Sequence, residues 1–202
     1  MPKSSARQVQ RARGKRIPRG MISVKVARAV AVEVMRRLRI RGPRGTRRPR
    51  AWVVGSVRRT MAEVDAAVHD VDLLVVADLT RVELAPARPG DRVASVTQRA
   101  AGARRRELVV GWVDQHRAVR VRVDLFGARS AELPWAMFAL SSSRDYQVRV
   151  RAVAARRGLL LNQYGLWVRA TGRPAPGSAS VRTERGVAKA IGVRWRPAAQ
   201  RR

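Results

Sequence analysis

At residues 70–76 the chain reads DVDLLVV, so two aspartates separated by one residue lead into an apolar run. On a β-strand, residues two apart point to the same face, which would place Asp70 and Asp72 side by side. Two carboxylates at that spacing repel each other, and a divalent cation relieves the repulsion. A turn that merely carries two acids before a buried strand is the ordinary alternative. The segment by itself leaves both interpretations open.

A second strand-like segment, residues 119–124, reads VRVRVD and alternates strictly between apolar and polar residues. This alternation places Arg120, Arg122 and Asp124 on one face and the valines on the other. On a neighbouring strand, Asp124 would be a third carboxylate and would complete the all-oxygen ligand set that Mg²⁺ prefers. Three carboxylates can hold two Mg²⁺ ions roughly 4 Å apart, the arrangement that serves phosphoryl transfer.

Upstream of both segments, residues 53–59 read VVGSVRR, a strand that leads into a Gly-Ser turn and two arginines. Gly55 lets the backbone approach a phosphate, Ser56 can donate its hydroxyl, and arginine binds phosphate oxygens through two N–H groups. A Gly-Ser pair is also common in plain turns. Its position ahead of an Asp-x-Asp strand favours a phosphate-binding role.

The remaining pattern predicts an α+β fold with a strand-rich middle. Two glycines and two prolines predict a basic loop over residues 41–50, because glycine and proline interrupt regular structure. We expect strands at residues 52–54, 71–76, 107–112 and 119–126, and helices at 21–38, 131–140, 147–157 and 184–191.

Charge is the most unusual property of the composition. The 202 residues include 44 Lys+Arg against 14 Asp+Glu, a formal net charge of +30. Such a surplus predicts an anionic partner, and nucleic acid is the commonest one. The cluster of arginines around Arg47 is consistent with either of two roles, DNA contact or nuclear import.

Two absences exclude whole classes of function. The chain has no cysteine, which excludes disulfides, thiolate metal sites and a cysteine nucleophile. No apolar run approaches the roughly 18 residues that a membrane span needs, so we expect no membrane partner. We therefore expect an intracellular protein, in the nucleus, the cytoplasm, a viral replication site or the virion.

Gly55-Ser56 followed by Asp70-Val71-Asp72 resembles the signature of the nucleotidyltransferase superfamily. Further segments resemble DNA polymerase family X, the polymerase beta group, and in particular its minimal viral members. The resemblance covers about residues 15–202. It rests on KRIPR at 15–19, GSVRR at 55–59, RVD at 122–124, the segment 146–164 with Gly158, Asn162 and Tyr164, and Glu184 with WRP at 195–197.

The resemblance implies a catalytic palm with a mixed β-sheet at residues 15–138 and a small C-terminal α/β subdomain at 139–202, behind a basic flexible tail at 1–14. It implies two Mg²⁺ ions, for which Mn²⁺ can substitute, bound by Asp70, Asp72 and Asp124. Asp124 would also help to deprotonate the primer 3′-hydroxyl, and Arg122 would orient Asp124 and the primer terminus. The phosphates of the incoming dNTP would be held by Gly55, Ser56, Arg59 and Arg16. DNA would be contacted by Arg144, Gln147, Arg151, Asn162 and Tyr164.

The sequence also departs from the family pattern. His69 stands where a phosphate-contacting glycine usually lies, and it can either touch a phosphate or cap the loop. Residues 139–143 read ALSSS in place of the aromatic hinge that backs the sugar, which leaves the rejection of ribonucleotides open. The fourteen residues before the palm are too few for the lyase domain and DNA clamp of larger members, so we expect no lyase activity.

The sequence thus predicts a monomeric, template-directed DNA polymerase that fills short gaps in primed or gapped DNA during repair. The first alternative is a template-independent terminal nucleotidyltransferase with the same metal centre. The second is a basic DNA-binding protein whose catalytic site is a relict.

Overall fold

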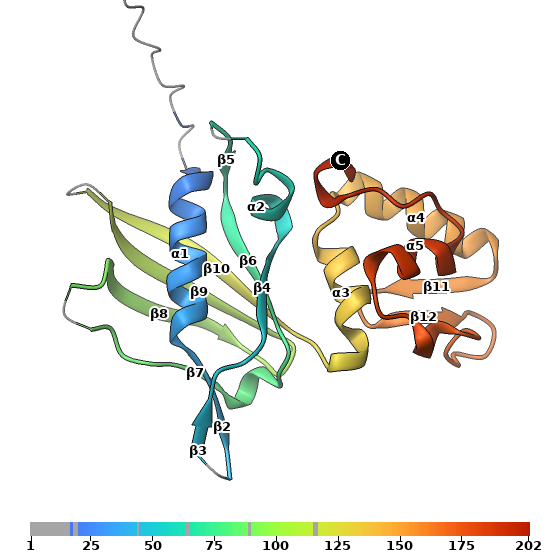
Figure 1. Ribbon diagram of the computed structural model, residues 1–202, viewed down its shortest axis with the longest axis horizontal. Coiled ribbons are helices and arrows are strands. Elements are labelled where there is room, and N and C mark those ends of the chain that lie inside the picture. Colours follow the sequence, from blue (N-terminus) through green and yellow to red (C-terminus); the bar gives the residue numbers. More distant parts are fainter. Residues whose placement is uncertain (1–16, 18–19, 44, 64, 89, 115–116) are drawn as a thin grey trace, which may run out of the picture.

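The structure is a computed structural model that describes residues 17, 20–43, 45–63, 65–88, 90–114 and 117–202. Figure 1 shows a large β-sheet body that carries one long helix, and beside it a smaller body formed by the C-terminal third of the chain. The predicted basic tail at 1–14 and Arg16 lie outside the described residues. Within those residues, no helix combines the length and the apolar character that crossing a membrane requires.

The large body is built on a five-stranded mixed sheet. Its strand order is β4 (Ala51–Val54), β6 (Asp70–Val75), β10 (Arg117–Gly127), β9 (Arg105–Asp114) and β8 (Val93–Ala101). The pair β6–β10 is parallel, and the other three pairs are antiparallel. The strands expected at 52–54, 71–76, 107–112 and 119–126 are confirmed, and β8 is a strand that the sequence analysis missed.

Helix α1 (Val24–Arg37) covers one face of this sheet. The spacing of its apolar residues explains why this segment is helical. Val24, Ala27, Val30, Ala31 and Val34 recur at helical spacing and are buried against the sheet. Ser23 caps the helix, since its hydroxyl accepts a hydrogen bond from the Val26 N–H at 3.2 Å. The cap shortens the expected helix, because Ile22–Ser23 is strand β1 and pairs with β5 (Ala67–Val68).

The expected loop at 41–50 is wrong, because most of that segment is a β-hairpin. Strand β2 (Leu38–Gly42) pairs with β3 (Gly45–Arg47) on one side and with β7 (Val82–Leu84) on the other. Gly45 has a φ of +93°, so it supplies the conformation that the tight turn needs. The glycines therefore form the turn of a hairpin instead of a longer loop.

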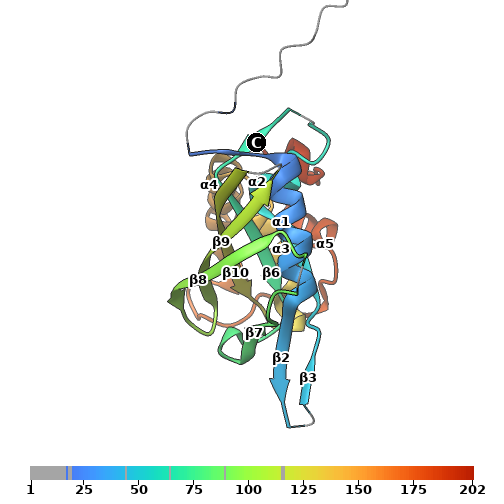
Figure 2. The ribbon, with the colours of Figure 1, turned by 90° about the vertical axis from the view of Figure 1, so that its left-hand side faces the viewer.

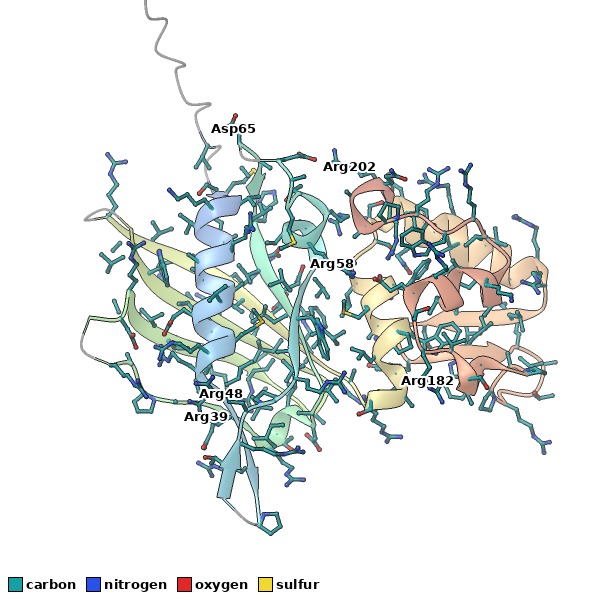
Figure 3. The ribbon with its side chains drawn as sticks, in the orientation of Figure 1. Arg39, Arg48, Arg58, Asp65, Arg182 and Arg202 are labelled. Carbon is teal, nitrogen blue, oxygen red and sulfur yellow. The ribbon has the colours of Figure 1, made fainter. Side chains whose placement is uncertain are left out.

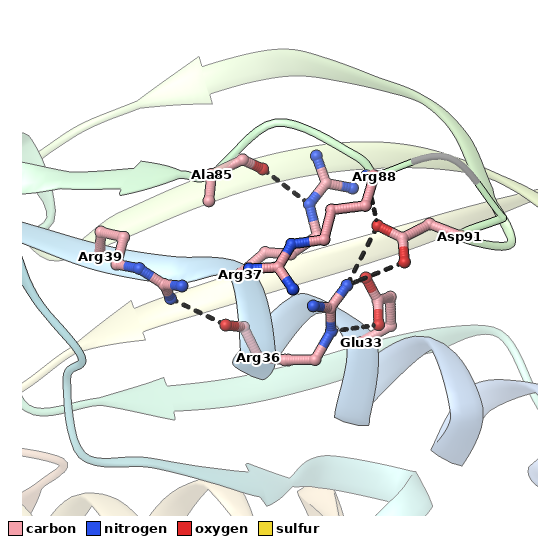
Figure 4. A network of polar contacts seen from close by, with 7 residues as sticks. All are labelled: Glu33, Arg36, Arg37, Arg39, Ala85, Arg88 and Asp91. Atoms are coloured by element: carbon pink, nitrogen blue, oxygen red, sulfur yellow. Dashed lines mark hydrogen bonds and ion pairs between the residues drawn. The ribbon is translucent and has the colours of Figure 1, made fainter.

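A salt-bridge network joins the end of α1 to the loop that precedes β8 (Figure 4). The Arg36 guanidinium bonds Glu33 at 2.6 Å and Asp91 at 3.0 Å. The neighbouring Arg37 donates to the Ala85 carbonyl at 2.8 Å. Asp91 also accepts a hydrogen bond from the Arg88 N–H, and this bond together with Arg36 keeps the pKa of Asp91 below its usual range.

The C-terminal body has its own apolar core, which includes Trp135, Phe138, Tyr146, Val150 and Ile191. Its regular elements are α3 (Leu133–Leu140), α4 (Arg144–Arg156), β11 (Leu159–Asn162), β12 (Gly165–Val168) and α5 (Glu184–Ile191). The short helical turns of the chain are α2 (Gly55–Arg59), η1 (Leu79–Arg81), η2 (Ser130–Glu132), η3 (Ser178–Ser180) and η4 (Ala198–Gln200). The three helices expected in this part of the chain are confirmed, whereas the hairpin β11–β12 was not expected.

Helix α3 connects the two bodies. Ala136 packs on Val54 and Leu74 of the sheet, while Trp135 and Phe138 belong to the second core. The helix thus runs across the expected boundary at 138/139, and that boundary stays a prediction.

We predict that Ser23→Ala lowers the free energy of unfolding by about 1 kcal/mol, because the Val26 N–H loses its partner at the helix terminus. Urea denaturation measures the effect, and Ser23→Asp, which retains an acceptor, should stay close to the unsubstituted chain. Equal loss in both variants would contradict the capping role.

Candidate active site

The parallel pairing of β6 with β10 brings three carboxylates together. In this register Asp72 lies opposite Asp124, and Asp70 lies opposite Arg122. Asp70, Asp72 and Asp124 each present one carboxylate oxygen, and these oxygens lie within 4.8 Å of one another. The structure therefore assembles the three acids that the two strand patterns singled out.

The donor set fits a hard divalent cation such as Mg²⁺ or Mn²⁺. All the candidate ligand atoms are carboxylate oxygens. Asp124 is only 4% exposed, and its Oδ1 atom is buried with no hydrogen-bond partner among the described residues. A buried carboxylate oxygen without a partner is costly, and a bound cation would remove that cost.

Two arginines already bind the outer oxygens of this cluster. The Arg105 guanidinium donates to Asp124 Oδ2 at 3.0 Å, and Arg122 forms an ion pair with Asp70. The sequence analysis predicted Arg122 as the partner of Asp124, and Arg105 was missed. Arg105 begins β9 opposite Phe126, so only the register of β9 with β10 reveals its proximity to Asp124.

Among the three acids of the cluster, Asp72 has a shifted pKa. Burial raises the pKa of Asp72 to about 7, and the charges of Asp70 and Asp124 act in the same direction, against Arg59 and Arg122. Near neutral pH and without a cation, Asp72 therefore holds a proton for much of the time. Cation binding requires its removal.

Gly55 lies against this carboxylate so closely that no other residue fits. It begins α2 with a φ of +65°, and a Cβ atom there would lie 2.7 Å from Asp72 Cγ. Such an atom would collide with Asp72 and would also strain the backbone. The Gly-Ser turn of the sequence thus places the backbone of α2 directly beside the acids.

A pocket of about 640 Å³ opens next to the acidic cluster. It is lined by Ser56, Arg59, His69, Asp70, Arg120 and Arg122, together with Gly20, Met21, Ala67 and Val68. The Ser56 hydroxyl is buried without a partner among the described residues, so it is available to a ligand. Three arginines and one acid line this pocket, and the resulting positive charge favours the binding of a polyphosphate.

The two arginines of α2 have different surroundings. Arg59 stays at the pocket, and burial lowers its pKa although the charge of Asp72 opposes the shift. Figure 3 shows Arg58 between the two bodies. Its guanidinium binds Glu184 of the C-terminal body at 2.6 Å and donates to the Ser141 hydroxyl at 2.6 Å. Of the two arginines, Arg59 therefore lines the pocket, as the sequence analysis expects of a phosphate-binding residue, whereas Arg58 joins the two bodies.

The five predicted DNA-binding residues differ in their exposure and in their contacts. Arg144 and Arg151 are exposed on α4, whereas Gln147 is buried on the same helix and its amide has no partner among the described residues. Asn162 Oδ1 accepts the N–H groups of Tyr164 at 2.8 Å and Gly165 at 3.1 Å, so it closes the turn of β11–β12. The Tyr164 ring packs against an arginine of the large body, Arg104, at 5.0 Å. The DNA contacts of these five residues stay predictions.

Comparison with known proteins agrees with this geometry. The family model described as DNA polymerase beta thumb matches residues 136–202. A Repair DNA polymerase X of African swine fever virus, isolate Pig/Kenya/KEN-50/1950, is 30% identical over 145 residues, which are 71% of this chain and 76% of the relative. The homologous protein of the Badajoz 1971 strain shows the same identity and coverage.

Two solved structures of Leishmania infantum polymerase beta share the fold. The ternary P/T complex superposes with a TM-score of 0.60 at 17% identity, over 90% of this chain and 77% of that chain. The ternary gap complex gives a TM-score of 0.63 at 16% identity, over 90% of this chain and 70% of that chain.

We predict that Gly55→Ala weakens Mn²⁺ binding by more than about tenfold, because the added methyl group displaces the Asp72 carboxylate. Gly172→Ala is the matched control: Gly172 has a φ of +64°, and no described atom lies within 4 Å of its would-be Cβ. The control therefore reports backbone strain alone. Equal Mn²⁺ affinities in the two variants, measured by titration, would refute the close-contact argument.

We also predict that Mg²⁺ stabilises the protein more at about pH 8 than at about pH 6. The raised pKa of Asp72 means that the folded chain binds this proton more tightly than the unfolded chain, so the stability due to this group falls as pH rises from about 4 to about 7. Above that window the ionised acid is free to bind Mg²⁺. Thermal unfolding with and without Mg²⁺ measures the difference, and Asp72→Asn should abolish it. An equal Mg²⁺ effect at both pH values would contradict this account.

Proposed function

The chain belongs to the family X DNA polymerases and is a DNA repair polymerase; we propose that it fills short gaps by adding deoxynucleotides, as a template directs, to a primer 3′-hydroxyl. The observation that carries the proposal is the in-register pair Asp72 and Asp124, with an unpartnered buried oxygen, beside a pocket rich in arginine. We propose an intracellular monomer that acts on dNTPs and on primed or gapped DNA.

Asp70, Asp72 and Asp124 would hold two divalent cations. When bound, these ions would offset the negative charge of the triphosphate and favour loss of the proton from the 3′-hydroxyl. The identity of the ions as Mg²⁺, with Mn²⁺ as a substitute, is part of the proposal. The oxygen-only donor set supports it.

The protein side chains would position the reactants. The Ser56 hydroxyl and the Arg59 guanidinium lie in the pocket beside the acids, where they would hold the phosphates that leave as pyrophosphate. In-line attack requires the primer 3′-hydroxyl to approach from the side opposite the leaving phosphates, so the primer must lie across the acidic cluster from Ser56 and Arg59. Arg122 lies on β10 opposite Asp70 and two residues before Asp124, and we propose that it orients the primer terminus.

The face of the sheet opposite α1 offers a seat for the primer–template duplex. Its exposed residues include Ser95 and Thr97 on β8 and Arg120 and Arg122 on β10. Gly111 of β9 lies between them, so close to Ser95 that a Cβ at Gly111 would be 2.5 Å from the serine hydroxyl. Small side chains between arginines allow a DNA backbone to lie close to the strands.

The C-terminal body would hold the template side. From Tyr146 to the last residue, the chain has 13 Lys+Arg and a single acid, Glu184. That acid is engaged by Arg58 at 2.6 Å and by Arg201 at 2.7 Å. The remaining positive charge supports contact with DNA phosphates, with Arg144 and Arg151 of α4 as the proposed contacts.

The proposal is tested by extending a labelled primer across a one-nucleotide gap with Mg²⁺ and each dNTP offered singly. We expect insertion of the complementary nucleotide alone. Addition without a template would instead identify a terminal transferase. Tight, salt-sensitive DNA binding without any incorporation would identify a binding protein with a relict site.

We predict that Asp124→Ala lowers the rate of insertion by more than about a thousandfold, since the loss of one ligand removes several kcal/mol of charge stabilisation. DNA affinity should be nearly unchanged, because the positive surface is intact. Asp65→Ala is the matched control, an exposed aspartate outside the cluster (Figure 3), and it should keep full activity. Persistent activity in Asp124→Ala would show that the site assignment is wrong.

A further inference from the structure

A narrow hairpin extends from the large body at the end remote from the acidic cluster. It consists of β2 and β3 with the residues up to Arg50, and we call it the arginine ribbon. Figures 1 and 2, related by a 90° turn, both show it projecting beyond the sheet and α1. Only its base is packed: Leu38 and Ile40 are buried, whereas the described residues from Arg41 to Arg48 are all exposed. The outer part of the ribbon therefore contributes nothing to the core.

The ribbon concentrates positive charge. Residues 38–50 contain six arginines, and the chain has no acid between Glu33 and Glu63. Glu83 on the neighbouring β7 bonds Arg41 at 2.5 Å, but the Arg41 side chain is 76% exposed, so the pair is weak. Among the described residues, Arg47 and Arg48 form no ion pair. Mutual repulsion destabilises such a cluster unless an anion binds it.

The base of the ribbon is held in one conformation. Residues Leu38–Ile40 pair with β7, and the Arg81 guanidinium donates twice to the Arg41 carbonyl, at 2.8 and 3.0 Å. Arg50 lies over the Trp52 ring at 5.2 Å, where the ribbon joins β4. Figure 3 shows Arg39 and Arg48 at this junction, below the end of α1. A fixed base lowers the entropy cost of binding through the exposed arginines.

The arginine ribbon is connected to the catalytic cluster through strand β4. Val54, which pairs with Asp72, follows Arg47 by seven positions, so the Cα atoms of Arg47 and Val54 are at most about 25 Å apart. Gly55 and α2, which would hold the leaving phosphates, lie at the other end of β4. In-line attack places the primer opposite the leaving group, which is the side on which the ribbon lies.

We propose that the arginine ribbon binds the sugar–phosphate backbone of the primer–template duplex within about seven base pairs of the primer terminus. This limit follows from the maximum distance of about 25 Å and a phosphate spacing of about 3.4 Å along each strand. The inference rests on the proposed function for the direction of the duplex. The ribbon would bind the upstream DNA whatever its base sequence, and this binding does not involve the catalytic acids.

The test compares two gapped DNAs, closed by a hairpin loop, with about three or about twenty base pairs upstream of the gap. The triple variant R41Q/R47Q/R48Q changes only exposed side chains, and an unchanged thermal unfolding temperature verifies its fold. On the long duplex, the slope of log affinity against log salt should fall by about two to three, at about 0.9 for each lost phosphate contact. On the short duplex the variant and the unsubstituted chain should bind alike.

The matched control R28Q/R88Q/R92Q removes the same charge from exposed arginines near α1. Unchanged salt dependence of the ribbon variant on the long duplex, an equal loss on the short duplex, or an equal loss in the control variant would each overturn the proposal. Single-turnover insertion at saturating DNA should be unchanged. Failure of the polymerase function would appear instead as absence of insertion in every variant, the unsubstituted chain included.

Discussion

Asp72 and Asp124 face each other because β6 and β10 pair in parallel, and most of the site depends on this one register. The pairing forces carboxylates together at a largely buried position in the middle of the sheet, where burial, and after it the charges of Asp70 and Asp124, raises the pKa of Asp72 to about 7. Arg105 and Arg122 reduce that repulsion from outside, and one oxygen of Asp124 is left without a partner among the described residues. The cluster thus keeps a buried oxygen that a cation would satisfy.

The backbone of α2 completes the arrangement from the other side. Because Gly55 has no side chain, α2 approaches Asp72 directly and carries Ser56 and Arg59 to the pocket. The same five-residue turn sends Arg58 across to Glu184, where Arg201 also binds. Arg201 is fully buried and lies 4.7 Å over the Phe138 ring, so the end of the chain is fixed against the α3–α5 body. One short turn therefore connects the proposed phosphate site with the position of the C-terminal body.

The acids of this chain are few, and most of the described ones form internal contacts. Glu33 and Asp91 bind Arg36, Glu132 binds Arg104, and Glu184 binds two arginines. The surplus arginines are consequently left at the surface, on the open face of the sheet, on α4 and on the arginine ribbon. This distribution accounts for a net charge of +30 in a chain that folds into two apolar cores.

Local patterns in the sequence were sufficient for the strands and helices that carry the acids. Strict alternation at 119–124 and the Asp-x-Asp spacing at 70–72 placed three carboxylates on strand faces, because side-chain direction on a strand depends only on parity. Contacts between distant parts of the chain could not be deduced from such local patterns. Arg58 and Glu184 are 126 residues apart, and only the packing of the two bodies brings them together. The hairpin at 38–47 was missed because Gly and Pro signal an interruption without showing whether the flanking residues pair.

The central claim is that the β6–β10 register builds a site for two cations. Its most direct test is anomalous diffraction from crystals of the chain with Mn²⁺, a dNTP and gapped DNA whose primer lacks the 3′-hydroxyl. We predict two Mn²⁺ peaks about 4 Å apart, both bound by Asp70 and Asp72 and one of them also by Asp124. A single peak, or ions that do not contact Asp124, would contradict the account.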